Sequence, residues 1–362
     1  MRKHYYDKLV DMIGREGLDA MLLAPSFELE FFLGNSPLLC ERFQALFVKR
    51  DGSCFYICNL LSSSEVRKML GPDVPVYQWF DGDDYLDIVS RAFTEQGLMG
   101  GVIGVNTTAQ VNNILQIAQA LNVTFKPGRT LLQELRVIKT DEEIEALTEA
   151  AHRADQVFGE ILQFIKPGMH EYEIKAKIAS LFTALGMPNN GNTVASGPNS
   201  SYPHYVDRER VIQDKDIILM GFGGTYKGLY ADMSRTIFVG GVTEEERKVW
   251  QLVKDANLAG IAAAHEGAFI PDVDKAARDV IEQAGYGQYF TTRLGHGIGY
   301  EEHEAPDIKK SNPHRMERNI AFSIEPGIYI DDHFGVRIED ICAITAGGLQ
   351  ILNQASKELI II

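Results

Sequence analysis

Three stretches of this 362-residue chain, GHGIGYEEHEAP (295–306), SIEPGIYI (323–330) and GVRIED (335–340), decide its fold together with the earlier segment YADMSRTIFV (230–239). Each stretch places ionisable side chains among glycines or among the apolar residues of an expected strand. A buried charge that has no partner costs free energy. These side chains therefore need counter-charges or a cation, and taken together they indicate a polar functional site.

Four of these side chains form a set of metal-ligand type: Asp232, His296, Glu325 and Glu339. Carboxylates with one imidazole suit Mn, Co, Fe or Zn, and such sets are typical of hydrolytic metal sites. Singly, each has an ordinary structural explanation. Asp232 could cap a turn, His296 could be a satisfied core histidine, and Glu339 could pair with Arg337 on the surface. The combination favours the metal site.

The C-terminal two thirds of the chain are expected to form a curved antiparallel sheet with helices packed on one side. Two capping boxes, Thr140 to Glu143 and Thr243 to Glu246, mark helix starts. Apolar residues at three- and four-residue spacing then predict helices. The expected helices are 141–165, 171–186, 244–265 and 272–285, and the expected strands are 217–224, 230–239, 320–330 and 335–345, followed by a last strand at ELIII. Glu325 is expected in the middle of its strand.

The first third of the chain alternates apolar runs with helix-period segments, which predicts an α/β domain with a largely covered sheet. Its expected strands are 18–24, 44–49, 54–58, 74–79 and 101–105. The Pro127-Gly128 pair interrupts this pattern. We therefore expect an N-terminal domain over 1–127, a linker over 128–140 and a catalytic domain over 141–362.

The formal charge of −15 disfavours non-specific binding to nucleic acid or to an anionic membrane, because both are polyanions. Four cysteines are too few to cross-link a chain of this length, and they are expected to be reduced thiols. The N-terminal segment is amphipathic and charged, unlike a signal peptide, and no apolar run reaches the ~18 residues that span a bilayer. We therefore expect a cytoplasmic protein.

The order and spacing of the quoted motifs resemble the peptidase M24 family, which includes methionine aminopeptidase, aminopeptidase P, prolidase and the creatinases. ELRVIKTDEEIEAL (134–147), VASGPNSSYPH (194–204) and the α/β N-terminal domain are similar to the same family. The resemblance implies the pita-bread fold for the catalytic domain. It also implies a peptidase of the Xaa-Pro dipeptidase or aminopeptidase P type, in which a metal-activated water attacks the bond before proline.

The resemblance also assigns roles to individual residues. Asp232, His296, Glu325 and Glu339 correspond to metal ligands, and Glu325 is the family's candidate general base. His303 corresponds to a histidine that contacts the substrate amide and stabilises the tetrahedral intermediate. His204 corresponds to a histidine on the substrate side, and Arg337 to an arginine that can meet a substrate carboxylate, which a guanidinium fork suits.

One position departs from the family pattern, because Gly221 stands where the family has an aspartate that chelates a second metal. A hairpin turn at Tyr226-Lys227 would place Gly221 directly opposite Asp232. We therefore expect one divalent ion rather than two, with Mn first and Co, Fe or Zn as alternatives. The same departure leaves two other hypotheses open, a creatinase-like C–N hydrolase and a binding protein without catalysis. A homodimer is also compatible with the resemblance.

Overall fold

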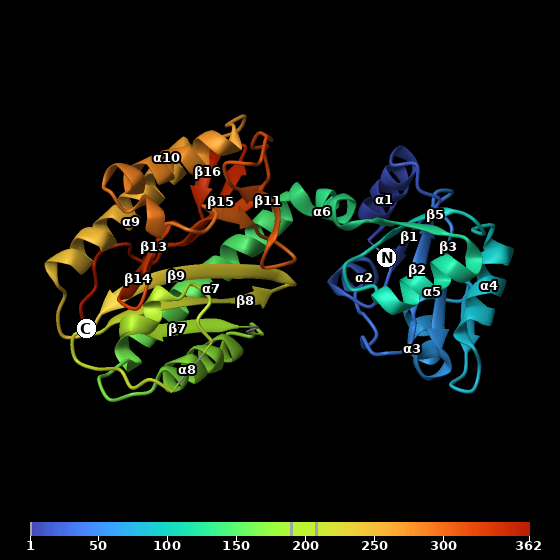
Figure 1. The fold of residues 1–362 in the computed structure, drawn as a ribbon, viewed down its shortest axis with the longest axis horizontal. Coiled ribbons are helices and arrows are strands. Elements are labelled where there is room, and N and C mark those ends of the chain that lie inside the picture. Colours follow the sequence, from blue (N-terminus) through green and yellow to red (C-terminus); the bar gives the residue numbers. More distant parts are fainter. Residues whose placement is uncertain (1, 189–190, 207–208) are drawn as a thin grey trace. The chain divides into compact units, whose positions relative to one another are not determined.

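The computed structural model describes residues 2–188, 191–206 and 209–362. The chain forms two units, Met1–Arg136 and Val137–Ile362, each with its own core (Figure 1). The first unit is an α/β layer, and the second combines antiparallel sheets with four long helices. Each unit is described below by itself.

The first unit contains a six-stranded sheet in the order β4-β3-β2-β1-β5-β6. Strand β2 runs antiparallel to both of its neighbours and the other pairs are parallel. The strands are β1 (Ala20–Leu23), β2 (Ala45–Lys49), β3 (Cys54–Asn59), β4 (Val76–Trp79), β5 (Val102–Val105) and β6 (Thr124–Pro127). The helices are α1 (Lys3–Arg15), α2 (Phe27–Leu33), α3 (Leu60–Leu70), α4 (Tyr85–Gln96), α5 (Val111–Leu121) and α6 (Arg129–Val137).

The α/β prediction for this unit is confirmed, and its five expected strands are present. The sequence reading missed β6, whose residues Thr124–Pro127 are mostly exposed and carry no apolar run. It also missed the short helix α2, which begins at the capping residue Ser26 and ends at Gly34 in the left-handed conformation. Helix α6 lies inside the segment that was expected to be a linker.

The four long helices of the second unit begin where the sequence signals them. They are α7 (Asp141–Phe164), α8 (Glu171–Ala184), α9 (Glu244–Ala263) and α10 (Ile270–Gln283). Both expected capping boxes are formed at the starts of α7 and α9. Helices α7 and α8 share an apolar core with one sheet, and α9 and α10 share another with the second sheet (Figure 1).

The strands of this unit form three sheets, and each pair of neighbouring strands within them is antiparallel. One contains β7 (Asn192–Ser196), β8 (Ile217–Tyr226) and β9 (Leu229–Phe238). A second has the order β11-β10-β12-β15-β16 and contains β10 (Gly295–Gly297), β11 (Glu304–Ile308), β12 (Ala321–Ile324), β15 (Asp340–Thr345) and β16 (Gly348–Ile351). The third is the hairpin of β13 (Gly327–Ile330) and β14 (Phe334–Arg337). A bridge between Ser234 and Glu339 joins the first two sheets.

Two expected strands are each broken in two, and both breaks lie at predicted metal ligands. The segment 320–330 is interrupted at Glu325-Pro326, so the prediction that Glu325 lies mid-strand is wrong. Proline lacks the N–H that a strand interior needs. The segment 335–345 is interrupted at Ile338-Glu339. The expected last strand is reduced to an isolated bridge between Phe238 and Ile361.

The β8–β9 hairpin has a different register from the predicted one. Its two turn residues are Lys227 and Gly228, both with positive φ (52° and 80°), as a tight primed turn requires. Gly223 therefore lies opposite Asp232, and Gly221 lies opposite Ser234. The predicted direct pairing of Gly221 with Asp232 is wrong, because the observed register differs from the predicted one by two residues. A shift of two residues leaves every side chain on the same face of the sheet. Gly221 therefore still lies on the same face of the hairpin as Asp232 and is its diagonal neighbour.

No helix in the described part of the chain is both long enough and apolar enough to cross a membrane.

Candidate metal centre

The four predicted ligands come from four separate strands or strand ends of the second unit. Asp232 lies in the middle of β9, and His296 is the central residue of the short strand β10. Glu325 directly follows β12, and Glu339 directly precedes β15. The backbone at each break is still fixed, because the Glu325 amide donates to Leu294 O (2.7 Å) and the Glu339 amide donates to Ser234 O (3.1 Å).

The ligand-type atoms of these four side chains converge on His296 Nε2. This nitrogen lies 3.1 Å from Glu325 Oε1, 3.9 Å from Asp232 Oδ2 and 4.0 Å from Glu339 Oε1. Two ligands bound to one ion at about 2.1 Å each lie no more than about 4.2 Å apart. All three separations satisfy that limit. His296, Glu325 and Glu339 form one group of ligand atoms close enough together to hold an ion, and Asp232, His296 and His303 form a second such group that shares His296.

Two details of hydrogen bonding direct free lone pairs toward this point. Glu339 Oε2 accepts a hydrogen bond from Ser234 Oγ (2.6 Å), whereas the buried Oε1 atom has no hydrogen-bond partner among the described residues. His296 Nδ1 lies 3.0 Å from Gly297 O, which favours the tautomer with the proton on Nδ1. With a cation bound, Nε2 would present its lone pair to the site, an arrangement typical of metal-binding histidines. Without one, Nε2 lies 3.1 Å from Glu325 Oε1, and in spite of burial the hydrogen bond and charge of Glu325 raise the pKa of His296. A cation bound at this point would contact both Glu339 Oε1 and His296 Nε2.

The electrostatics of the cluster indicate that positive charge is missing. Burial raises the pKa of Asp232 well above its usual range, and the charges of Glu339, Glu302 and Glu325 add to the effect. Burial and the charge of Glu325 raise the pKa of Glu339 to about 7. The pKa of Glu325 is lowered, because the hydrogen bond and charge of His296 outweigh its burial. Such crowding of carboxylates is relieved by a bound cation.

His303 lies beside these ligands, in the loop before β11. Its ring contacts that of His296 edge to face, with 4.2 Å between ring centroids, and its nitrogen lies near Asp232 as well. Although His303 is exposed, desolvation by the surrounding atoms and the charges of His296 and Arg293 lower its pKa to about 4. His303 is therefore a neutral imidazole at pH 7, able to donate one hydrogen bond.

His204 and Arg337, the two residues predicted to bind substrate, lie close to the same centre. His204 is exposed and follows the short 3-10 helix η1 (Gly197–Ser201), and its charge contributes to the lowered pKa of His303. Arg337 ends β14, and its Nε donates to Ser234 Oγ (2.8 Å). Ser234 thus connects Arg337 to Glu339. The structure brings all seven predicted residues into one region.

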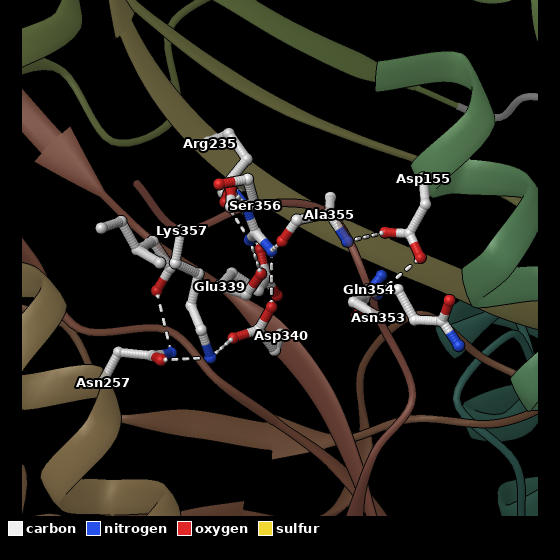
Figure 2. Close-up of polar contacts among 12 residues, drawn as sticks. Asp155, Arg235, Asn257, Glu339, Asp340, Asn353, Gln354, Ala355, Ser356 and Lys357 are labelled. Atoms are coloured by element: carbon white, nitrogen blue, oxygen red, sulfur yellow. Dashed lines mark hydrogen bonds and ion pairs between the residues drawn. The ribbon is translucent and has the colours of Figure 1, made fainter. Parts of the chain in front are cut away.

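A buried polar network behind the ligands was missed by sequence reasoning. Arg235 donates from Nη1 to the carbonyl oxygens of Ser234 (2.9 Å) and Glu339 (2.5 Å), and from Nη2 to Asp340 Oδ1 (2.7 Å). Lys357 donates to the other oxygen of Asp340 (2.7 Å) (Figure 2). The only signal was that Arg235 and Asp340 are near or adjacent to predicted ligands in the sequence. The partner Lys357 could not be found in this way.

A second missed contact supports the loop that carries His303. Glu304, the next residue, forms a buried ion pair with Lys139 (2.7 Å), whose side chain is fully buried. Tyr300 donates to Glu143 (2.5 Å), the capping residue of α7. Residues at the start of α7 therefore hold both ends of the segment 300–304.

The acids Asp214 and Asp216 do not replace the aspartate missing at Gly221, because Arg210 binds Asp216 (2.9 Å) and Asp214 lies near Gly240.

Comparison with known proteins agrees with this geometry. The model of metallopeptidase family M24 matches residues 145–346, more than half of the chain. The protein belongs to this family. The creatinase/prolidase N-terminal domain matches residues 6–138. The pita-bread prediction for the second unit is confirmed, and the M24 protein is a hydrolase of the metallopeptidase class, which implies a divalent metal.

Named relatives cover nearly the whole chain. It is 32% identical over 353 residues to a probable dipeptidase PepE of Mycobacterium tuberculosis, covering 96% of this chain and 92% of the relative. It is 31% identical to an Xaa-Pro dipeptidase of Pyrococcus furiosus, covering 99% and 100%. Among solved structures, a prolidase from Thermococcus sibiricus has a TM-score of 0.93 at 31% identity, covering 100% of this chain and 99% of the other.

Proposed function

We propose that this protein is a metal-dependent peptidase of the Xaa-Pro dipeptidase or aminopeptidase P type, which hydrolyses the bond before proline. The observation that carries the proposal is the convergence of Asp232, Glu325 and Glu339 on His296 Nε2, where Glu339 Oε1 has no hydrogen-bond partner in the described part of the chain. The names of the relatives, dipeptidases and Xaa-Pro dipeptidases, support the same substrate class.

The proposed cofactor is one divalent ion, with manganese as the first candidate and Co, Fe or Zn as alternatives. Asp232, His296, Glu325 and Glu339 would hold it. Three carboxylates and one imidazole suit these ions, and availability decides among them. When bound, the ion supplies a Lewis acid and lowers the pKa of a water molecule toward neutrality.

Glu325 is the proposed general base. In the metal-free protein the hydrogen bond and charge of His296 lower the pKa of Glu325 against the effect of burial. A bound cation would keep the carboxylate ionised in the same way, so that an Oε atom can accept the proton of the attacking water. His303 is the proposed oxyanion donor. As a neutral imidazole it donates an N–H to the oxygen on which negative charge develops, the kind of contact that contributes most to such reactions.

His204 and Arg337 are the proposed substrate-binding residues. Arg337 Nε and Nη1 are engaged by Ser234, Tyr329 and the carbonyl oxygen of Pro203, whereas Nη2 makes no hydrogen bond with another described residue. A fixed guanidinium with one free N–H pair can receive the carboxylate oxygen of a short peptide. The exposed imidazole of His204 would contact the same side of the substrate.

The test is proline release from the dipeptide Ala-Pro, with added manganese and with a chelator. We expect release that depends on manganese, and much slower cleavage of Ala-Ala. His296→Ala should abolish release, whereas the matched variant His333→Ala should retain it, because His333 is exposed and its side chain pairs with Glu245 (3.3 Å) at the surface. Absence of release with any of the four metals would contradict the proposal and favour a creatinase-like C–N hydrolase or a binding protein.

We also propose a homodimer and a cytoplasmic location. The first unit exposes large apolar side chains, among them Leu38, Leu61, Phe80 and Val111, which a subunit interface would bury. Light scattering coupled to gel filtration tests the dimer, and a monomer at micromolar concentration would contradict it. All four cysteines are free thiols, which suits a reducing compartment, and fractionation of the source cells tests the location.

A further inference from the structure

The space beside Gly221 is filled by the guanidinium of Arg337. Gly221 lies on the same face of the β8–β9 hairpin as Asp232 and Ser234, so a side chain at 221 would project toward the candidate metal centre. A Cβ atom added at this position would collide with Arg337 Nη2 and would lie 3.2 Å from Ser234 Oγ and 3.6 Å from Arg337 Cζ. The cationic end of Arg337 therefore occupies the volume in which a ligand side chain would begin.

The guanidinium is held in this position by groups on three segments. Nε donates to Ser234 Oγ (2.8 Å) on β9, and Nη1 donates to Tyr329 OH (3.2 Å) on β13 and to Pro203 O (3.4 Å). The backbone of Arg337 is fixed too, since its amide donates to Thr236 Oγ1 (3.1 Å) and its carbonyl accepts from the same hydroxyl (3.0 Å). The place of this cation is thus set by the fold.

The partners of Arg337 connect it to the ligands without neutralising it. The Ser234 hydroxyl that accepts from Nε donates to Glu339 Oε2 (2.6 Å). Within the described residues, the hydrogen-bond partners of the guanidinium are neutral oxygens. The positive charge therefore acts on the ligand cluster as a whole. Burial raises the pKa of Asp232 and Glu339, and the charge of Arg337 opposes this rise at both carboxylates.

The charges of the centre balance when Arg337 is included. Asp232, Glu325 and Glu339 carry three negative charges, and His296 is neutral when it binds a cation. One divalent ion leaves a net charge of −1, and the permanently protonated Arg337 brings the sum to zero. A second divalent ion would leave an excess of +2 in a largely buried cluster, with no carboxylate at Gly221 to bind it.

We propose that Arg337 is the second cation of this centre: its guanidinium occupies the place beside Gly221 and excludes a second divalent ion. The inference rests on the proposed metal-dependent function and deepens it. Unlike a metal ion, a guanidinium cannot act as a Lewis acid, but it offers planar N–H donors to an anionic oxygen. Gly221 and Arg337 thus form a matched pair, in which the missing side chain makes room for the cation.

The test is the manganese content of the intact protein and its variants after loading with excess Mn²⁺ and desalting. Elemental analysis gives the number of ions per chain, and low-temperature electron paramagnetic resonance separates isolated Mn²⁺ from a spin-coupled pair. We expect one uncoupled ion in the unaltered protein. Two coupled ions would overturn the inference alone. Failure to bind any Mn²⁺, Co²⁺, Fe²⁺ or Zn²⁺ would overturn the proposed function as well.

Substitutions at positions 221 and 337 then test whether Arg337 is the group that excludes the second divalent ion. Gly221→Asp should still bind one ion, because the introduced carboxylate meets the guanidinium. Gly221→Asp combined with Arg337→Met should bind two, whereas Gly221→Asp combined with Arg337→Lys, which keeps the charge, should bind one. Two ions in the single variant, or one ion in the Arg337→Met double variant, would overturn the inference. Retention of the first ion shows that a variant is folded.

A second measurement covers the case in which the Gly221→Asp variants do not fold. Arg337→Met removes one positive charge near the three carboxylates, whereas Arg337→Lys keeps it. Because Mn²⁺ and a cationic side chain a few ångströms apart repel each other even with partial screening, the Met variant should bind its single Mn²⁺ at least about tenfold more tightly than the Lys variant. Equal dissociation constants, measured by titration calorimetry, would overturn the role of Arg337 as a cation of this centre.

Discussion

The contribution of the buried Arg235–Asp340–Lys357 network to the stability of the second unit can be measured directly. The side chain of Asp340 is 1% exposed, and it faces Arg235 at 3% and Lys357 at 16% (Figure 2). Asp340→Asn keeps the shape of the side chain and removes its charge. Two cations then remain in the protein interior without their common counter-charge. Breaking a buried pair by removing one partner costs about 3–5 kcal/mol.

The remaining contacts of Arg235 set the expected value within that range. Its guanidinium keeps four carbonyl acceptors, from Ser234, Glu339, Ala355 and Ser356. These hydrogen bonds stabilise the charge in part. Lys357 also keeps a neutral acceptor, Asn257 Oδ1 (3.2 Å). We therefore expect Asp340→Asn to lower the free energy of unfolding by about 3 kcal/mol, the lower end of the range.

The assay is urea unfolding of the second unit, followed by tryptophan fluorescence. The chain has two tryptophans, and Trp250 packs in the core of the second unit whereas Trp79 belongs to the first. In a Trp79→Phe background the signal comes from Trp250 alone. With a urea dependence of about 3 kcal/mol per molar, a loss of about 3 kcal/mol moves the midpoint down by about 1 M.

The matched control is Glu358→Gln, which removes a carboxylate next to Lys357 in the sequence. Glu358 is 77% exposed and pairs with Lys254 at the surface (2.7 Å). Exposed pairs contribute about 0–1 kcal/mol, so the control should move the midpoint by less than about 0.3 M. If Asp340→Asn moves the midpoint no further than Glu358→Gln does, the network does not stabilise this unit as argued.

Three further predictions concern the metal centre. His303→Ala should lower the turnover number about 10²- to 10³-fold while the protein keeps its bound manganese, and unchanged turnover would reject the oxyanion role. Glu339→Gln should lower both the affinity for manganese, measured by equilibrium dialysis, and peptide cleavage, and normal affinity would show that Glu339 is not a ligand. Burial and Glu325 raise the pKa of Glu339 to about 7 in the metal-free protein. The folded state therefore holds this proton more tightly than the unfolded state, and the resulting stability is lost as the pH rises from about 4.5 to about 7. Thermal unfolding with a chelator should show this loss in the unaltered protein, and a loss of equal size in Glu339→Gln would contradict it.

Local patterns in the sequence were sufficient for much of the fold. The capping boxes at Thr140 and Thr243 place two helix starts correctly, because a cap depends only on residues three positions apart. The five expected strands of the first unit are present for a similar reason, since each is a short apolar run between polar segments. The predictions failed where local signals are weak or equivocal, as in the exposed strand β6 and at the breaks beside Glu325 and Glu339.

The hairpin of β8 and β9 shows the limit of such patterns. Alternation in the sequence correctly puts Asp232 and Ser234 on one face, but two turn positions differ in register by two residues without changing that face. The positive φ angles at Lys227 and Gly228 decide between them. As a result Gly221 is the diagonal neighbour of Asp232, and the residue directly across from Asp232 is Gly223.

The sequence by itself determined the family and the two-unit organisation of sheet types, and it predicted the candidate donor residues, because motifs and periodicity are properties of neighbouring positions. Only the tertiary structure decided how those donors meet. It brought Asp232 within 3.9 Å of His296, placed Lys357 against Asp340, and filled the space beside Gly221 with Arg337. These contacts join residues that lie 17 to more than 100 positions apart. Their geometry follows from packing and burial of charge across the whole unit, which no local pattern encodes.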